Sequence, residues 1–280
     1  MVRRVLLLCA ALLLASCHAS CLAPKAELLD AQIAKTIANA PPRGSKHFDH
    51  SRFDALLAEH VRYDAGRVDY AGLKKDADAL DAYLQKLAGA DLSSLDRPEL
   101  EALLIDAYNA FTLHLILEHY PHLASIRDLD DPWGTRRYDL GGTKVSLDDV
   151  EHGLLRPIFR DPRIHFAVNC ASIGCPKLAP HAYVGGKVGE QLDAAARSTL
   201  SDPRYARLTD DGTLQLTRVM SWYGDDFTNP KFSPRADTIP GFVAKFTDDP
   251  HIKARVDGHP GEVPVEFMSY DWRLNDVQPK

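Results

Sequence analysis

The segment between Asp96 and Pro121 constrains the fold of this chain more than any other. Asp96 is a good helix N-cap, Pro98 suits the first helical turn, and Glu99 stands at the capping-box position. The residues that follow are apolar on most faces of the helix, not on one stripe. Such a helix has to be covered on all sides. We therefore predict that residues 97–120 form the central helix of the hydrophobic core.

The elements before and after this helix differ in kind. Apolar residues at helical spacing predict several more helices within residues 48–88. After the central helix, the Gly-Gly pair within residues 138–145 is typical of a tight turn between two strands, and Asp211-Gly212 predicts a second hairpin. Helices first and short strands later predict an α+β fold, with a helix-rich N-terminal half packed on a small, mainly antiparallel sheet.

Further elements are expected in the second half. Ser146 is placed to cap a helix that runs to about residue 155, and residues 186–200 are amphipathic at helical spacing. The run Arg-Ile-His-Phe-Ala-Val at residues 163–168 predicts a short buried strand, and residues 263–267 predict a late strand. Gly, Ser and Pro make residues 169–180 a loop.

The first 16 residues have the organisation of a secretory signal. Two arginines precede ten apolar residues, a stretch too short to span a hydrocarbon core of roughly 30 Å. The sequence Leu-Ala-Ser-Cys follows and ends at Cys17; it resembles the lipobox of bacterial lipoproteins, in which cleavage precedes the Cys and the Cys is lipidated. We predict a lipoprotein signal peptide over residues 1–16, a lipid on Cys17, a lipidated tether and linker over residues 17–45, and a single α+β domain over residues 46–280.

These features imply a location and exclude several partners and activities. A lipidated protein of this kind faces the periplasm of a bacterial cell envelope, and His18 in place of Asp favours the outer membrane. The formal net charge of -6 lacks the basic excess that nucleic-acid binding requires. The chain has no Gly-rich phosphate loop, no His-Glu-x-x-His and no Gly-x-Ser-x-Gly. We therefore expect no cofactor, no metal and no nucleic acid; the membrane is the expected partner through the lipid, and a protein or glycan partner stays unidentified.

Reactive side chains gather on residues 165–181. They are His165, Asn169, Cys170, Ser172, Cys175 and His181. One interpretation is a disulfide between Cys170 and Cys175, which would cross-link the loop in an oxidising compartment. A second is a thiol nucleophile at Cys170. A zinc site is the third, although the spacing of the two cysteines and two histidines is not usual for zinc.

A thiol nucleophile needs an imidazole as base and a group that orients the imidazole. His165 is near in sequence, but residues five apart on a strand point to opposite faces, so His152 is an equally good base. Glu151, Asn109 or Asp271 would orient it. Other interpretations remain open for two of these residues. Glu151 also complements a helix dipole, and the amide of Asn109, on the central helix, is expected to bond loop backbone.

At these residues the chain resembles the family catalogued as domain of unknown function 547. The matching motifs lie at residues 108–113, 146–152 and 165–172, with Cys175-Pro176, and weaker matches extend the resemblance to about residues 48–275. Plant members keep a Cys that resembles Cys170 and often carry Ser where Cys175 stands, which implies a role for the first Cys besides a disulfide. In papain-like and transglutaminase-like enzymes the Cys precedes the His. Such a fold would require a permuted order here, because the candidate bases His152 and His165 precede Cys170.

The sequence thus predicts a lipid-anchored envelope protein of uncharacterised function. Its leading interpretation is a thiol-based hydrolase or acyl-transfer site around Cys170, with His165, His152, Glu151 and Asn109 around the sulfur. The alternative is a non-catalytic envelope binding or structural module with a disulfide between Cys170 and Cys175.

Overall fold

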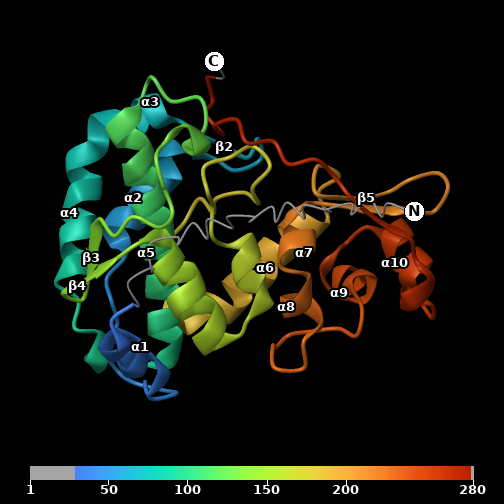
Figure 1. Cartoon of the computed structure of the whole chain (residues 1–280), viewed down its shortest axis with the longest axis horizontal. Coiled ribbons are helices and arrows are strands. Elements are labelled where there is room, and N and C mark those ends of the chain that lie inside the picture. The colour runs from blue at the N-terminus through green and yellow to red at the C-terminus, as the bar shows by residue number, and fades with distance from the viewer. Residues whose placement is uncertain (1–28, 279–280) are drawn as a thin grey trace, which may run out of the picture.

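A computed structural model describes residues 29–278, with helix α5 (Arg97–His119) at the centre of the helical half (Figure 1). The Asp96 carboxylate accepts a hydrogen bond from the Glu99 backbone N–H at 3.0 Å, so the predicted cap is confirmed. Glu99 does not complete a capping box; its carboxylate bonds the imidazole of His47 and the backbone N–H of Phe48. Among the described helices only α5 is long and apolar enough to cross a membrane. Of its most apolar stretch of 18 residues, 89% is buried inside the protein, as in a core helix.

The first half is mainly helical, as predicted. Besides α5 it contains α1 (Ala31–Ala38), α2 (Ser51–His60), α3 (Tyr70–Leu73), α4 (Ala77–Ala88) and the short 3₁₀ turns η1 (Lys74–Asp76), η2 (Leu92–Ser94) and η3 (Ile126–Asp128). Two antiparallel pairs accompany them, β1 (Val61–Arg62) with β2 (Arg67–Val68), and β3 (Tyr138–Leu140) with β4 (Thr143–Val145). Gly141 and Gly142 have φ values of 55° and 79°, which confirms the predicted Gly-Gly turn.

The second half mixes short helices with one small sheet. Its helical segments are η4 (Asp149–Phe159), η5 (Pro162–Phe166), η6 (Gly185–Lys187), α6 (Val188–Leu200), α7 (Val219–Trp222), α8 (Gly224–Thr228), α9 (Ile239–Phe246), α10 (Pro250–Val256) and η7 (Pro260–Glu262). The sheet contains β5 (Ala206–Leu208), β6 (Leu214–Leu216) and β7 (Val265–Phe267), with β5 antiparallel and β7 parallel to β6. The fold is α+β, and its strands form three small sheets in place of the single sheet expected.

One predicted element is wrong. Residues 163–168 do not form a strand; Pro162–Phe166 form the 3₁₀ helix η5. Pro162 stands in the first turn, and the Asp161 carboxylate accepts a hydrogen bond from the Arg163 backbone N–H at 2.9 Å, so both residues start a helical turn. The hydrophobic pattern of so short a run does not distinguish a strand from a buried helical turn.

The predicted helix that begins after Ser146 is present with an altered geometry. The Ser146 hydroxyl accepts a hydrogen bond from the Asp149 backbone N–H at 3.0 Å, which confirms the cap. The helix, η4, has π geometry and continues past the expected end to Phe159, with Pro157 inside it. π-helical segments are uncommon and are found frequently at functional sites.

The buried apolar residues form two clusters. The first surrounds α5 and includes Ile33 and Ile37 of α1, so part of the region predicted to be a tether packs against the folded body. The second includes Phe166 of η5 and Phe242 of α9, and its other buried residues lie between residues 196 and 263. The predicted signal peptide and lipidated Cys17 lie outside the described residues.

The C-terminal segment joins the two halves. After β7 the chain returns across the top of the molecule to the helical half (Figure 1). There the Leu274 N–H bonds the Ala124 carbonyl at 2.8 Å, and the Val277 N–H bonds the Val68 carbonyl at 3.0 Å. On its way it pairs with residues 169–176, which we call the Cys170 loop.

Candidate functional site

Two buried asparagines hold the Cys170 loop. The Asn109 side chain, on α5, donates to the Ala167 carbonyl at 3.0 Å and accepts from the Asn169 N–H at 2.9 Å. Asn169 in turn accepts from the Ala171 N–H at 2.8 Å and donates to the Pro176 carbonyl at 2.7 Å. These bonds satisfy both amides, as buried polar groups require. Asn109 therefore bonds loop backbone, as expected, and it positions the loop that carries Cys170.

The C-terminal segment closes the loop from the other side. Backbone hydrogen bonds of 2.9–3.0 Å link residues 171, 173 and 174 of the loop to residues 275, 273 and 271. At Gly174 a Cβ would lie 2.8 Å from the Asp271 nitrogen and 3.0 Å from the Tyr270 ring, so only glycine allows this approach. Ala171, the residue after Cys170, has φ of 61°, a left-handed conformation that is rare for a residue with a Cβ. The result is a tight turn with Tyr270 beside it.

The Cys170 sulfur lies among three polar side chains. Its Sγ is 3.0 Å from the Tyr270 hydroxyl, 3.3 Å from the Cys175 Sγ and 3.6 Å from the Ser172 hydroxyl. Both cysteines are free thiols. A disulfide has an S–S length of about 2.05 Å, so the disulfide interpretation describes a bond that is not formed in this structure. Cys170 is partly exposed, whereas Cys175 is 6% exposed.

The surroundings of the two thiols change their acidities in opposite directions. Hydrogen bonding with Cys175 lowers the pKa of Cys170 to about 7, and hydrogen bonding with Tyr270 and Ser172 adds to this effect, so that together they outweigh burial. Burial first, and then the interaction with Cys170, raise the pKa of Cys175 well above its ordinary value. Burial also raises the pKa of Tyr270, which keeps it a neutral hydrogen-bond donor at neutral pH. This pattern makes Cys170 the more acidic thiol of the pair.

The first predicted histidine, His165, lies in a buried network of charged groups. Its Nε2 is 2.8 Å from the Asp226 carboxylate, its Nδ1 is 3.7 Å from the Glu151 carboxylate, and its ring stacks on Tyr223 at 3.8 Å between centroids. Arg156 donates two hydrogen bonds of 2.7 and 3.0 Å to Asp226. These bonds, with those from His165, lower the pKa of Asp226 to about 2 although burial alone would raise it.

The second predicted histidine, His152, lies at the edge of this network. It is 3.8 Å from the Asp148 carboxylate and 3.4 Å from the Arg156 guanidinium, and its side chain is partly exposed. Glu151 is buried, which alone would raise the pKa of its carboxyl, but the nearby His165 ring and the charge of His152 outweigh burial and lower that pKa. In the described part of the chain no hydrogen bond joins either imidazole to the Cys170 sulfur. The assignment of a histidine as the base for Cys170 stays a prediction.

Two tyrosines connect the network with the thiols electrostatically. Burial raises the pKa of Tyr108 and of Tyr223, and the charges of Glu151 and Cys170 raise both further. Each hydroxyl is therefore close enough to sense Glu151 and Cys170 together. The structure brings Cys170, Glu151 and His165 into one region. Tyr108 and Tyr223, not a direct contact, link the Cys170 sulfur to the His165 imidazole.

Comparison with known proteins gives one match. Residues 92–199 match the model of a family described as protein of unknown function, DUF547. We call these matched residues the DUF547 region. No curated protein and no solved structure matches the chain.

The DUF547 region contains only part of the site. It includes Asn109, Glu151, His165 and both thiols, whereas Asp226 and Tyr270 lie beyond it. Sequence reasoning missed both of these residues as site components. The signals that were available are the weaker resemblances at residues 222–227 and 270–275, which contain them.

Aromatic rings gather around Tyr270, the tyrosine beside Cys170. We call this set, Trp133, Trp222, Tyr270 and Trp272, the aromatic face. Tyr270 lies 4.8 Å from Trp222 and 4.5 Å from Trp272 between ring centroids, and Trp133 contacts Trp272 at 6.0 Å. Trp222 is 46% exposed. The other three side chains are partly buried, so none of the four lies wholly inside the core.

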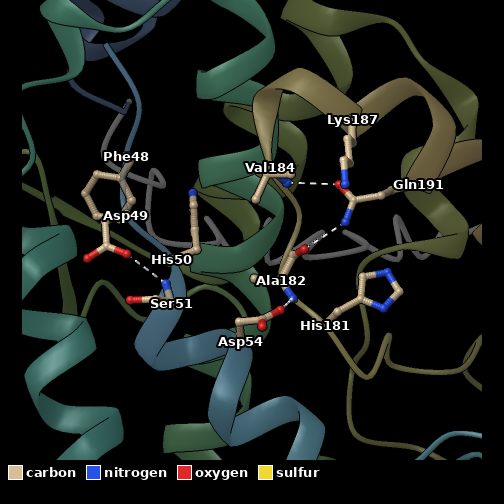
Figure 2. Close-up of a pocket in the computed structure, with 10 residues that line it drawn as sticks. All are labelled: Phe48, Asp49, His50, Ser51, Asp54, His181, Ala182, Val184, Lys187 and Gln191. Atoms are coloured by element: carbon tan, nitrogen blue, oxygen red, sulfur yellow. Dashed lines mark hydrogen bonds between the residues drawn. The ribbon is translucent and has the colours of Figure 1, made fainter.

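A separate pocket of about 590 Å³ lies between the chain around His50 and the chain around Lys187 (Figure 2). Its lining includes His181, a residue of the zinc interpretation, whereas His165 of the same interpretation is bonded to Asp226. The residues proposed for zinc are therefore not gathered around one point. Within residues 29–278 one other group, Glu59, His60 and Asp76, has ligand atoms close enough to share an ion; its His60 Nε2 is 2.8 Å from the Asp76 carboxylate.

His50, in the wall of this pocket, forms a second buried histidine–carboxylate pair. Its Nδ1 lies 2.8 Å from the Asp106 carboxylate and 2.8 Å from the Tyr83 hydroxyl. Asp106 also accepts a hydrogen bond from the Tyr183 backbone N–H at 3.1 Å. The residues that line the pocket do not include Cys170, so this pocket is not the place where the thiol would meet a substrate.

Proposed function

We propose that the protein is a lipid-anchored envelope protein that carries out thiol-based hydrolysis or acyl transfer at Cys170. The observation that carries this proposal is a partly exposed residue, Cys170, whose sulfur is held by Tyr270, Ser172 and Cys175 and has a pKa of about 7. At neutral pH about half of such a thiol is thiolate, so the first chemical step needs no partner base.

The proposed reaction begins when the Cys170 thiolate attacks the carbonyl carbon of an ester, thioester or amide. The carbonyl electron pair moves to oxygen; it then re-forms the carbonyl and expels the leaving group, which takes up a proton. The acyl group is now a thioester on Cys170, and water or another acceptor removes it in the second step. Tyr270, a neutral donor 3.0 Å from the sulfur, is placed to stabilise the thiolate and to donate a proton to the leaving group.

The other predicted residues support this site from a distance. Asn109 is a positioning residue, because its amide holds the backbone on both sides of Val168. His165 anchors η5, the turn that leads into the Cys170 loop, to Asp226. Glu151 contributes a buried charge next to His165 and Tyr223. We propose that this network orients the loop and accepts protons in the second step.

Covalent trapping tests the reaction. Reduced protein is mixed with a small acyl thioester and with p-nitrophenyl acetate, quenched in acid and analysed by intact mass and peptide mapping. We expect one acyl group on Cys170, no adduct in Cys170→Ser, and an adduct in Cys175→Ser, which keeps the nucleophile. Equal acylation of the wild type and Cys170→Ser, or none in either, contradicts the proposal.

A second candidate function is that of a non-catalytic binding module, and the exposure of Trp222 on the aromatic face favours it. Planar aromatic surfaces with one accessible ring suit contact with a sugar ring or an apolar side chain. If this function holds, Trp222→Ala weakens co-sedimentation with purified envelope polysaccharide, whereas Cys170→Ser does not. Equal sedimentation of Trp222→Ala and wild type would exclude a glycan role for this face.

The location is part of the proposal and rests on residues 1–17. The basic start, the apolar stretch and the Leu-Ala-Ser-Cys sequence support cleavage before Cys17 and its lipidation. We expect the full chain to fractionate with outer membranes, to incorporate a palmitate analogue and to lose both properties in Cys17→Ser. Recovery of Cys17→Ser in the membrane fraction to the same extent as wild type would overturn the anchor.

A further inference from the structure

We propose that Cys170 and Cys175 are a redox-active dithiol that exchanges with disulfides, with Cys170 as the attacking thiol and Cys175 as the resolving thiol. This inference uses the thiolate of the proposed function but needs no acyl substrate. It assigns a function to Cys175, which acyl transfer does not require.

The positions of the two sulfurs support it. The Sγ atoms are 3.3 Å apart, so they have to approach by only about 1.2 Å to reach the length of a disulfide. The Cys170 N–H also bonds the Cys175 sulfur at 3.1 Å, which fixes the second thiol against the backbone of the first. Loop closure is already achieved by the asparagines and the C-terminal segment, so little ordering remains for the bond to form.

Unequal access sets the order of the two steps. Cys170 is partly exposed and can be reached by an external disulfide, whereas Cys175 is 6% exposed and also lies within sulfur hydrogen-bonding distance of the Val168 carbonyl. An incoming disulfide therefore meets Cys170 first. Cys175 then reacts with a sulfur that is already its neighbour.

The charges of the pair support the same order. The Cys170 thiolate raises the pKa of Cys175, through their hydrogen bond and through its charge, and so keeps the second thiol protonated. Once Cys170 has entered a mixed disulfide, that negative charge is gone. This cause of the raised pKa then disappears, and Cys175 ionises more readily at the moment when it is needed as a nucleophile.

The reaction balances without any cofactor. The Cys170 thiolate attacks an R–S–S–R disulfide, forms Cys170–S–S–R and releases RS⁻. Cys175 then loses its proton to water, its thiolate attacks the Cys170 sulfur, and a second RS⁻ leaves. Counted from the dithiol, in which Cys170 first gives its proton to water, the protein loses two electrons and two protons; the electrons reduce the oxidant, a small-molecule or protein disulfide, and the protons convert its two RS⁻ into thiols.

The test uses the mature protein in glutathione buffers of varied ratio without oxygen, quenched in acid, alkylated and mapped by mass spectrometry. We expect reversible loss of two hydrogen atoms with Cys170 linked to Cys175. Cys175→Ser should accumulate a stable glutathione adduct on Cys170, and Cys170→Ser should form no adduct on Cys175. The far-ultraviolet circular dichroism of each variant is compared with that of the wild type. If a variant does not fold, rapid quenching of the wild type, with its transient Cys170 adduct, replaces it.

Three outcomes would overturn the inference. In the first, the wild type stays reduced in excess oxidised glutathione. In the second, it stays oxidised in excess reduced glutathione, as a structural disulfide would. In the third, the first glutathione adduct forms on Cys175. Failure of the proposed function looks different, because acylation is measured on reduced protein. Where both hold, the reduced form is acylated on Cys170 and the oxidised form is not, and an added reductant restores acylation.

Discussion

Two buried histidine–aspartate pairs, one in each half of the molecule, have the same nitrogen–oxygen distance and different electrostatics. His50 with Asp106 lies in the helical half, and His165 with Asp226 lies beside the second hydrophobic cluster. In both pairs a ring nitrogen and a carboxylate oxygen are 2.8 Å apart.

The neighbours of the two carboxylates differ. Asp106 has a backbone N–H as its other partner, and burial raises the pKa of its carboxyl although His50 opposes this effect. At Asp226 burial also disfavours the charge, but hydrogen bonds from His165 and Arg156 prevail and lower its pKa to about 2. The comparison shows that a buried carboxylate keeps its charge when a cation accompanies the histidine.

The largest expected difference between the two pairs comes from replacing each aspartate with asparagine, which removes the carboxylate charge. Asp226→Asn leaves the buried His165 and the partly buried Arg156 without their anion and should lower the free energy of unfolding by about 3 kcal/mol. Asp106→Asn removes a charge that its site already disfavours and should cost about 1 kcal/mol. Urea unfolding of both variants measures the difference, and equal losses would contradict the distinction.

The pH dependence of stability should separate the two pairs in sign. The folded pKa of Asp226 lies below its ordinary 3.8, so its contribution, about 2 kcal/mol, is present above pH 4 and is lost as the pH falls toward 2. The folded pKa of Asp106 is raised, so its contribution is present at low pH and is lost as the pH rises through that pKa.

Unfolding by urea between pH 2 and pH 7 checks these signs. Relative to wild type, Asp226→Asn should lose less stability on acidification, and Asp106→Asn should lose less on the alkaline side of the Asp106 titration. Parallel curves for wild type and both variants would show that neither carboxyl changes its pKa on folding.

The two pairs should also differ in their effect on the thiol site. His165 lies on η5, directly before the Cys170 loop, whereas His50 lies in the wall of a pocket that does not include Cys170. Asp226→Asn should therefore slow alkylation of Cys170 by iodoacetamide several-fold at pH 7, and Asp106→Asn should leave the rate unchanged. A common change in both variants would indicate a global loss of structure instead of a local one.

The smallest expected effect concerns the pair formed by His50 and Asp106. Tyr83→Phe removes the hydroxyl 2.8 Å from the His50 ring but leaves Asp106 as its partner. The expected loss is about 1 kcal/mol in the free energy of unfolding, that of one ordinary buried hydrogen bond. Leu80→Ala, a control on the same helix that removes buried apolar atoms, should cost about 3 kcal/mol. A loss from Tyr83→Phe as large as that of the control would show that the hydroxyl, rather than Asp106, holds His50.

Much of the fold was predictable where neighbouring residues decide it. Asp96 caps the central helix through a contact three residues away, and Gly141-Gly142 form a turn because they tolerate positive φ. The Cys170 loop was identified from the composition of one segment. The strand predicted at residues 163–168 was wrong because Pro162 and Asp161 favour a helical turn, a local signal that the apolar pattern outweighed in the prediction.

The sequence by itself determined the α+β class, the central helix and the loop that contains Cys170 and Cys175, because these depend on backbone preferences and on hydrophobic patterns along short segments. Only the tertiary structure decided which groups surround the sulfur. Tyr270 is 100 residues from Cys170, and Asp226 is 61 residues from His165. Contacts at such separations form only when the whole chain packs, and they set the acidity and the accessibility of each thiol.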